Sequence, residues 1–147
     1  MPTLQNAYNI IILVYIKIKE ILMSKYSITQ FGTMADVAKT EYGKVFLHDA
    51  LNLTSAEISI SVMPAGAKSP FNHIHKQNEE IYIFLTGSGI FTVDDEKIEI
   101  KPGTAIRVAT GAKRAMENTG TTEMQYICVQ AKEKSLTQFA FADAEVC

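Results

Sequence analysis

Residues 72–87 read NHIHKQNEEIYIFLTG. In this stretch, side chains of the types that bind metals come directly before an apolar run. In an extended chain, side chains two positions apart project from the same face, so His73 and His75 point the same way. Glu80 follows five residues after His75. Two imidazoles and a carboxylate suit Fe(II), Mn(II), Ni or Zn if the fold returns Glu80 to the histidine pair. On spacing alone, surface histidines and a solvated glutamate remain the simpler explanation.

The apolar half of this stretch predicts a strand, and similar strands follow and precede it. Residues 81–85, IYIFL, are apolar on both faces, which indicates burial on both sides, in a sandwich or at a dimer contact. Residues 56–63 (AEISISVM) and 97–101 (KIEIK) alternate apolar and polar side chains, and residues 124–130 (MQYICVQ) favour a buried pleated surface. Many short strands separated by turn residues predict an all-β sandwich or barrel.

Two segments outside these strands carry weaker signals. Residues 34–39, MADVAK, read as a short helix, and residues 135–141, SLTQFAF, as a final strand. The periodicity by itself does not separate a jelly roll from another barrel.

Composition bounds the class of protein. The chain has 147 residues, 47% hydrophobic and 20% charged, which is typical of one globular domain. The net charge of −2 argues against a nucleic-acid partner, which usually needs a basic patch. Only two cysteines, Cys128 and Cys147, are present, so a disulfide-stapled secreted scaffold is excluded and free thiols in a reducing cytoplasm are expected.

The first 22 residues form a separate segment with an apolar run, IIILVYI, at residues 10–16. The run is too short to span a bilayer, which needs about 20 residues, and it lacks the flanks of a signal peptide. We expect no membrane association. Either this extension adds a strand or short helix to the domain at 23–147, or it is not part of the natural protein. In the second case Lys19-Glu20 would be encoded by a ribosome-binding sequence and translation would start at Met23.

The central segment resembles the cupin superfamily, small β-barrels of the jelly-roll type (an antiparallel double-stranded β-helix). His73, His75, Glu80 and Gly87 match the first cupin motif in order and spacing, although Gly66 lies one residue too far upstream. In the second motif, Gly103, Gly111 and Asn118 fall on the pattern, while Ala109 replaces a proline and Arg114 replaces a histidine. The resemblance covers about residues 56–130 and implies a small single-domain cupin with an altered second motif.

The resemblance implies that His73, His75 and Glu80 are metal ligands, and it makes Arg114 the central question, because that position usually carries the fourth ligand. Arginine has no lone pair to offer and places a fixed positive charge at the cavity. Three hypotheses follow. A divalent metal still binds, and Arg114 holds a substrate carboxylate. Alternatively, no metal binds, Arg114 pairs with Glu80, and the pocket takes a sugar or an organic acid. In the third, the site is vestigial.

Two further residues are candidates for the same cavity. His48, the only other histidine, could replace the missing ligand or contact substrate if its strand faced the cavity. Tyr82 shares the face of Glu80 by alternation and could line the site or simply pack in the core. Cys128 is expected to be a small buried hydrophobe.

The function classes that stay open are a metalloenzyme and a non-catalytic small-molecule binder. Metal-dependent dioxygenases, isomerases and decarboxylases all occur among cupins, so the resemblance does not choose the reaction, and no catalytic residue is assigned. A homodimer is expected from the habit of the family and from the doubly apolar IYIFL strand.

Overall fold

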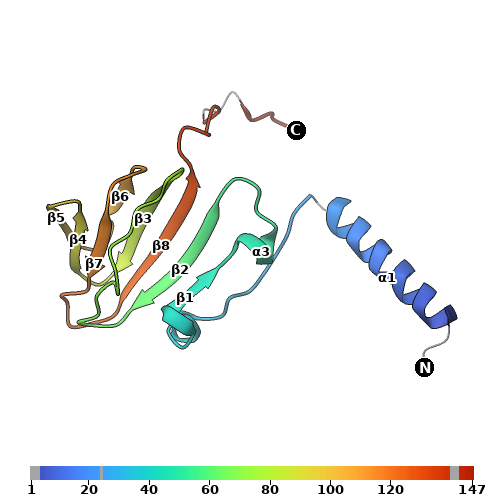
Figure 1. Cartoon of the computed structure of the whole chain (residues 1–147), viewed down its shortest axis with the longest axis horizontal. Coiled ribbons are helices and arrows are strands. Elements are labelled where there is room, and N and C mark those ends of the chain that lie inside the picture. The colour runs from blue at the N-terminus through green and yellow to red at the C-terminus, as the bar shows by residue number, and fades with distance from the viewer. Residues whose placement is uncertain (1–3, 24, 140–142) are drawn as a thin grey trace.

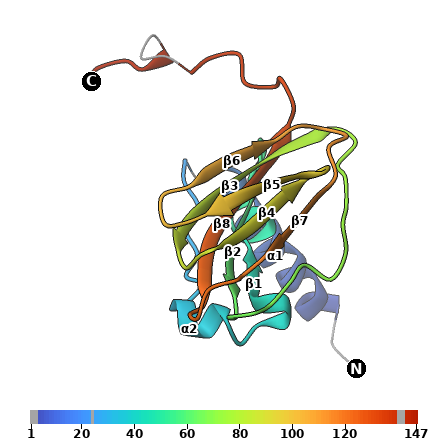
Figure 2. The same ribbon diagram turned by 90° about the vertical axis from the view of Figure 1, so that its left-hand side faces the viewer.

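Two antiparallel sheets packed face to face form the body of this protein (Figures 1 and 2). The computed structural model describes residues 4–23, 25–139 and 143–147. The larger sheet has the strand order β1-β2-β8-β3-β6, and the smaller has the order β5-β4-β7. The strands are β1 (Lys44–Phe46), β2 (Glu57–Met63), β3 (Asn78–Thr86), β4 (Gly89–Val93), β5 (Glu96–Ile100), β6 (Ala105–Val108), β7 (Arg114–Glu117) and β8 (Met124–Lys132). The predicted all-β antiparallel architecture is therefore confirmed.

Alternation along β3 and β8 decides which of their side chains enter the space between the sheets. In β8 the inward face carries Met124, Tyr126 and Cys128, which are at most 6% exposed. Cross-strand pairing aligns Tyr82 of β3 with Cys128, so the inward faces of the two strands coincide. Because the side-chain period of a strand is two, a slip of one residue would turn this whole set outward.

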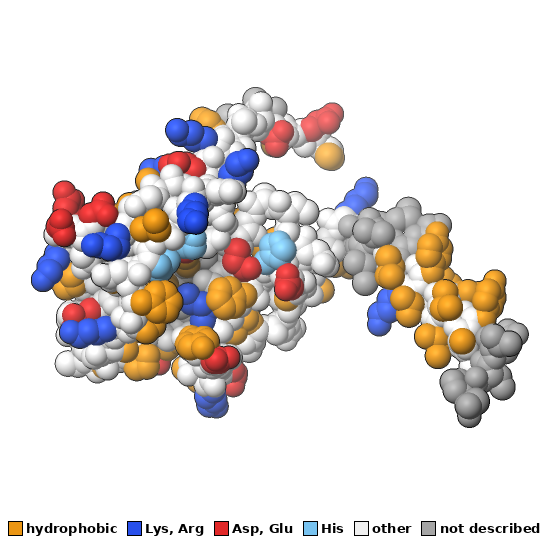
Figure 3. Space-filling view, viewed as in Figure 1, with side chains coloured by type: hydrophobic (Ala, Val, Ile, Leu, Met, Phe, Trp, Pro, Cys, Tyr) orange, Lys and Arg blue, Asp and Glu red, His pale blue; other side chains and the backbone are white. Residues whose placement is uncertain are grey.

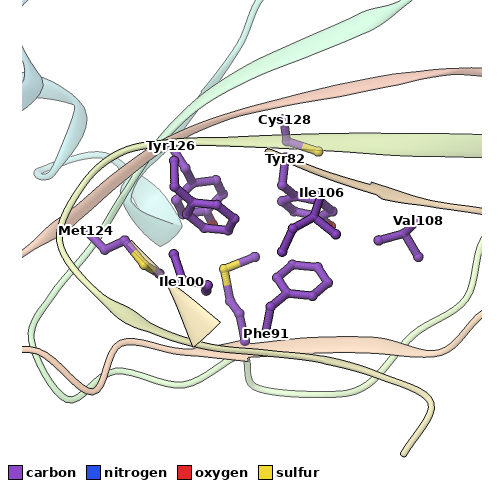
Figure 4. Packing of buried hydrophobic residues seen from close by; sticks show 10 residues of the cluster. Tyr82, Phe91, Ile100, Ile106, Val108, Met124, Tyr126 and Cys128 are labelled. Atoms are coloured by element: carbon purple, nitrogen blue, oxygen red, sulfur yellow. The ribbon is translucent and has the colours of Figure 1, made fainter. Parts of the chain in front are cut away.

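The core between the sheets is rich in aromatic rings (Figure 4). The Tyr82 and Phe91 rings meet edge to face with centroids 4.8 Å apart, and Phe84 lies 5.5 Å from Tyr126. Such pairs contribute about 0.5–1.5 kcal/mol each beyond the burial of their apolar surface. They also link β3 and β8 of one sheet to β4 of the other. The site-bearing strand β3 therefore has a rigid support.

Asn118, just after β7, ties three turns together. Its side chain is fully buried, and its Nδ2 donates to the carbonyl oxygens of Met63, Pro64 and Thr122 at 2.9–3.1 Å. Its Oδ1 accepts from the backbone N–H of Gly120 at 3.0 Å. The amide thus bonds to four backbone groups at the ends of strands and in the turns beside them. It anchors the chain that leaves β2 towards the histidine pair.

The helices are few and lie outside the two sheets. Residues 34–39 contain α2 (Met34–Val37), which begins at a capping box between Thr33 and Asp36. A 3₁₀ turn, η1 (Glu41–Gly43), and α3 (His48–Leu51) flank β1. The sequence did not indicate α3, and its first residue, His48, was expected on a strand. That expectation is wrong.

The N-terminal extension forms α1 (Leu4–Met23), which stands apart from the sheets (Figure 1). Hydrophobic side chains cover it on the face seen in Figure 3. The exposed ones include Ile11, Leu13 and Tyr15, each about two-thirds exposed. Among the helices of the described residues, none has both the length and the hydropathy that a membrane span requires. The start of translation at Met23 stays a prediction.

Two details of the strand predictions need correction. On β3 only the inward face, with Tyr82 and Phe84, is buried within one chain; Ile81 and Ile83 are half-buried, and Leu85 is 47% exposed. The predicted strand at 135–141 is not formed in its described part, residues 135–139, and its last two residues lie outside the described chain. The last strand along the described chain, β8, lies in the middle of the larger sheet, and residues 135–139 pair with no strand.

Candidate functional site

The two histidines lie in the extended segment between β2 and β3, which runs beside the start of β7. His73 and Arg114 exchange backbone hydrogen bonds of 3.3 and 3.0 Å, and the carbonyl of His75 accepts from Gly111 N–H at 2.9 Å. These bonds hold the segment extended, so both rings project from one face.

Glu80 points inward from β3 and completes the cluster. Its Oε1 lies 3.1 Å from His75 Nε2, and its Oε2 lies 3.9 Å from His73 Nε2. One ligand atom from each of the three residues lies within 4.8 Å of the others. The fold therefore brings together the three side chains that the sequence singled out, and both Nε2 atoms face the carboxylate.

Three further side chains hold the Glu80 carboxylate in place. Tyr82 Oη donates to Oε2 at 2.6 Å, while Gln130 Nε2 and Cys128 Sγ donate to Oε1 at 3.4 and 3.6 Å. Glu80 itself is only 5% exposed. A buried carboxylate needs such donors to remain ionised. The role of Tyr82 is therefore double, because its ring packs in the core and its hydroxyl orients Glu80.

The protonation states suit a cation. Burial raises the pKa of Glu80, but the Tyr82 hydrogen bond and the nearby His75 and Arg114 outweigh it, so this pKa lies below its usual value of 4.5. Burial lowers the pKa of His73 below 6.5, and the Arg114 charge adds to this effect although Glu80 opposes it. At neutral pH the carboxylate is charged and the His73 ring is neutral. Metal ligands require both states.

Arg114 is the most unusual group of the site. It begins β7, is 1% exposed, and its Nε lies 3.5 Å from Glu80 Oε2. Its Nη2 donates to the Ala109 carbonyl at 3.2 Å, but its buried Nε and Nη1 have no hydrogen-bond partner. The expectation of a fixed positive charge beside Glu80 is thus met, with most of its donors unused.

The donor set fits a divalent transition metal. Two imidazole nitrogens and one carboxylate oxygen in close convergence are suited to Fe, Mn, Ni or Zn and would leave coordination positions open. The hydrogen bonds that orient the three ligand side chains are not equally complete. Glu80 is well held, whereas the buried Nδ1 of His73 has no hydrogen-bond partner, a contact that metal-bound histidines usually make.

His48 stands apart from the cluster. It is the first residue of α3, its side chain is 48% exposed, and its Nδ1 pairs with Asp49 Oδ1 at 2.8 Å. The groups of metal-binding side chains found in the described residues do not include it. No contact recorded for the described chain joins His48 to the site, so a substrate role for it rests on the sequence alone.

Sequence reasoning missed Gln130 and the thiol of Cys128 as partners of the carboxylate. A signal existed, because alternation along residues 124–130 places both on one face of that strand. What was lacking was the register that pairs Glu80 with Gln130 and Tyr82 with Cys128. Burial was predicted correctly for Cys128, whose pKa is raised to about 12 by that burial and by Glu80.

Comparison with known proteins agrees with this architecture. A family model described as "Cupin domain" matches residues 59–130. The crystal structure of a cupin protein from Bacteroides fragilis is 41% identical, with a TM-score of 0.74, and the match covers 85% of this chain and 99% of that one.

Two curated relatives are more distant. An uncharacterised protein of Methanocaldococcus jannaschii is 29% identical over 106 residues, 63% of this chain and 84% of its own. An oxalate-binding protein of Thermotoga maritima is 33% identical over 57 residues, 39% of this chain and 47% of its own. With the double-sheet fold and the motif residues in register, these matches show that the chain belongs to the cupin superfamily.

Proposed function

We propose that this protein binds a divalent transition metal through His73, His75 and Glu80 and that a small, anionic organic molecule binds beside it. The convergence of three ligand atoms within 4.8 Å around a buried, ionised carboxylate carries the proposal. Bound there, the metal would supply a Lewis acid or an oxygen-activating centre. The chemistry would then be that of a metal-dependent dioxygenase, isomerase or decarboxylase.

The residues of the chain have separate roles in this proposal. His73 and His75 offer Nε2 atoms from the edge of the site, where their side chains are 38% and 25% exposed. Hydrogen bonds from Tyr82 and Gln130 keep the carboxylate of Glu80 turned towards the two histidines. Arg114 provides the positive charge that selects an anion. The oxalate-binding relative supports a small carboxylate as the ligand class.

The metal centre is tested by elemental mass spectrometry of untagged protein purified without chelator. We expect about one equivalent of Fe, Mn, Ni or Zn per chain, as one three-ligand cluster implies. Glu80→Gln and His75→Ala should each lower that content sharply, because each removes a ligand. His48→Ala is the matched control and should retain the metal. Full metal content in both site variants would place the metal elsewhere.

A second candidate function is a metal-free, non-catalytic binder of a sugar or an organic acid. The 3.5 Å approach of Arg114 Nε to Glu80 Oε2 favours it, because a pair formed between these groups occupies the carboxylate that a metal needs. Two results together would establish this function: the protein takes up no metal after reconstitution, and it binds carboxylates with an affinity that Arg114→Met lowers. Stoichiometric metal in the wild-type protein would overturn it.

Assembly and location complete the proposal. We propose a homodimer that covers the outer face of β3, where Ile81 and Ile83 are half-buried and Leu85 is exposed. We also propose a cytoplasmic protein without a nucleic-acid partner, since both cysteines are free and the net charge is −2. Light scattering after size exclusion measures the assembly, and a mass of one chain would contradict the dimer.

A further inference from the structure

The guanidinium of Arg114 has donors that the described chain leaves unused. The side chain is 1% exposed and thus lies away from bulk solvent. The Nη2 atom donates to the Ala109 carbonyl, whereas Nε only approaches Glu80 Oε2 at 3.5 Å, and neither Nε nor Nη1 makes a hydrogen bond within the described chain. Leaving buried donors of a charged group unpaired is costly, so the arrangement is that of a receptor for an acceptor-rich anion.

The charge balance around the cluster also favours a bound anion. The formal charges of Glu80 and Arg114, 3.5 Å apart, cancel one another. Lys44 is a further cation that acts on His73. A divalent ion at the three ligands would therefore add two uncompensated positive charges next to a buried guanidinium. Repulsion between like charges at a desolvated site opposes this, and a bound anion relieves it.

We propose that the metal and a small carboxylate bind to this site cooperatively, with Arg114 holding the carboxylate and thereby setting the affinity for the metal. This inference rests on the proposed metal centre. The anion offsets the charge excess that the metal introduces, and the metal offsets the cost of burying the anion. Coupling between two ligands is reciprocal, so each raises the affinity for the other by the same factor.

The exposures of the site residues bear on the kind of ligand, because only the histidines keep accessible surface. Glu80 and Arg114 are 5% and 1% exposed, whereas His73 and His75 retain accessible surface at the edge of the cluster. With Glu80 engaged by the metal, a neutral sugar would leave the guanidinium charge uncompensated. A short carboxylate matches both the enclosure and the charge-assisted hydrogen bonds that Arg114 can donate.

Co²⁺ titrations of the full chain, followed by visible absorption of the bound ion, test the proposal with acetate as the probe anion. Titrations are made in chloride and in acetate at matched ionic strength. We expect acetate to tighten the apparent Kd for Co²⁺ by roughly tenfold, a typical size for coupled sites. Acetate complexes of free Co²⁺ would shift the result in the opposite direction, so they do not imitate it.

Variants assign the coupling to one residue. Arg114→Met should bind Co²⁺ more tightly than the wild type in chloride and lose the acetate effect. Arg114→Lys keeps a charge and should stay weak in chloride, which preserves the test if the methionine variant unfolds. Arg107→Met is the matched control. Arg107 lies on the other face of the sheet, paired with Glu79 and Glu133, so the acetate effect should remain.

The outcomes separate the coupling from the metal centre. Co²⁺ binding that is insensitive to acetate in the wild type, or an acetate effect that persists in Arg114→Met, overturns the coupling and leaves the metal centre standing. Absence of Co²⁺ binding in both media, in the wild type and in Arg114→Met, overturns the metal centre and the coupling with it. Tenfold tightening that Arg114→Met loses and Arg107→Met keeps supports both.

Discussion

Replacing Glu80 by glutamine should destabilise the metal-free protein, because the buried charge of Arg114 loses its ion-pair partner. The two groups lie 3.5 Å apart and are 5% and 1% exposed. At an effective dielectric constant near 20, their attraction is about 5 kcal/mol, part of which offsets the cost of burying both charges. Breaking a buried pair on one side typically costs about 3–5 kcal/mol, and we expect Glu80→Gln to fall in that range.

A double-mutant cycle measures the pair separately from the other bonds of the carboxylate. Arg114→Met should cost less than Glu80→Gln, because Glu80 keeps the Tyr82 hydrogen bond and its contact with His75. The double variant should recover about 2–3 kcal/mol relative to the sum of the single changes.

The free energy of unfolding of metal-free protein, from urea titrations with chelator present, gives the answer. Glu79→Gln, which touches only the outer pair with Arg107, is the control and should cost at most about 1 kcal/mol. Additivity of the two site changes within about 0.5 kcal/mol would refute the reasoning, because it would show that Arg114 does not depend on Glu80.

Three further predictions concern other parts of the fold. Asn118→Ala should cost about 2–3 kcal/mol in urea unfolding, because a fully buried amide and its hydrogen bonds to four backbone groups are lost, and Asn118→Asp should not rescue it; a cost below about 1 kcal/mol would contradict this. Iodoacetamide at pH 8 should label Cys147 but not Cys128, whose pKa burial raises to about 12, and equal labelling of both in folded protein would be inconsistent with the core packing. Hydrogen bonds from Thr33 lower the pKa of Asp36 below 3.8, so its stabilisation is present above pH 3.8 and is lost as the pH falls through the folded value. The difference in urea midpoint between wild type and Asp36→Asn should therefore shrink below pH 3.8, and a constant difference would argue against the capping box.

Local sequence patterns were enough to predict the strands with clear alternation and the types of side chain in the proposed metal site. The apolar run at 81–85 indicated β3, and the paired histidines with Glu80 indicated a cluster that the fold does assemble. The same patterns left residues 10–16 open between strand and helix, because a short apolar stretch has no periodicity to distinguish them, and these residues lie in α1. They were wrong at His48, which starts α3 instead of lying on a strand.

The sequence by itself determined which faces of the strands are apolar, because side chains alternate with a period of two whatever the partner strand is. It also determined that Arg114 carries a fixed charge where other cupins carry a histidine. Only the tertiary structure decided what this charge meets. Strand register places Gln130 opposite Glu80 although 50 residues separate them, and the His73–Arg114 bridge closes a loop of similar length. Such contacts depend on which strands pair and in what register, and a local pattern contains no information about either.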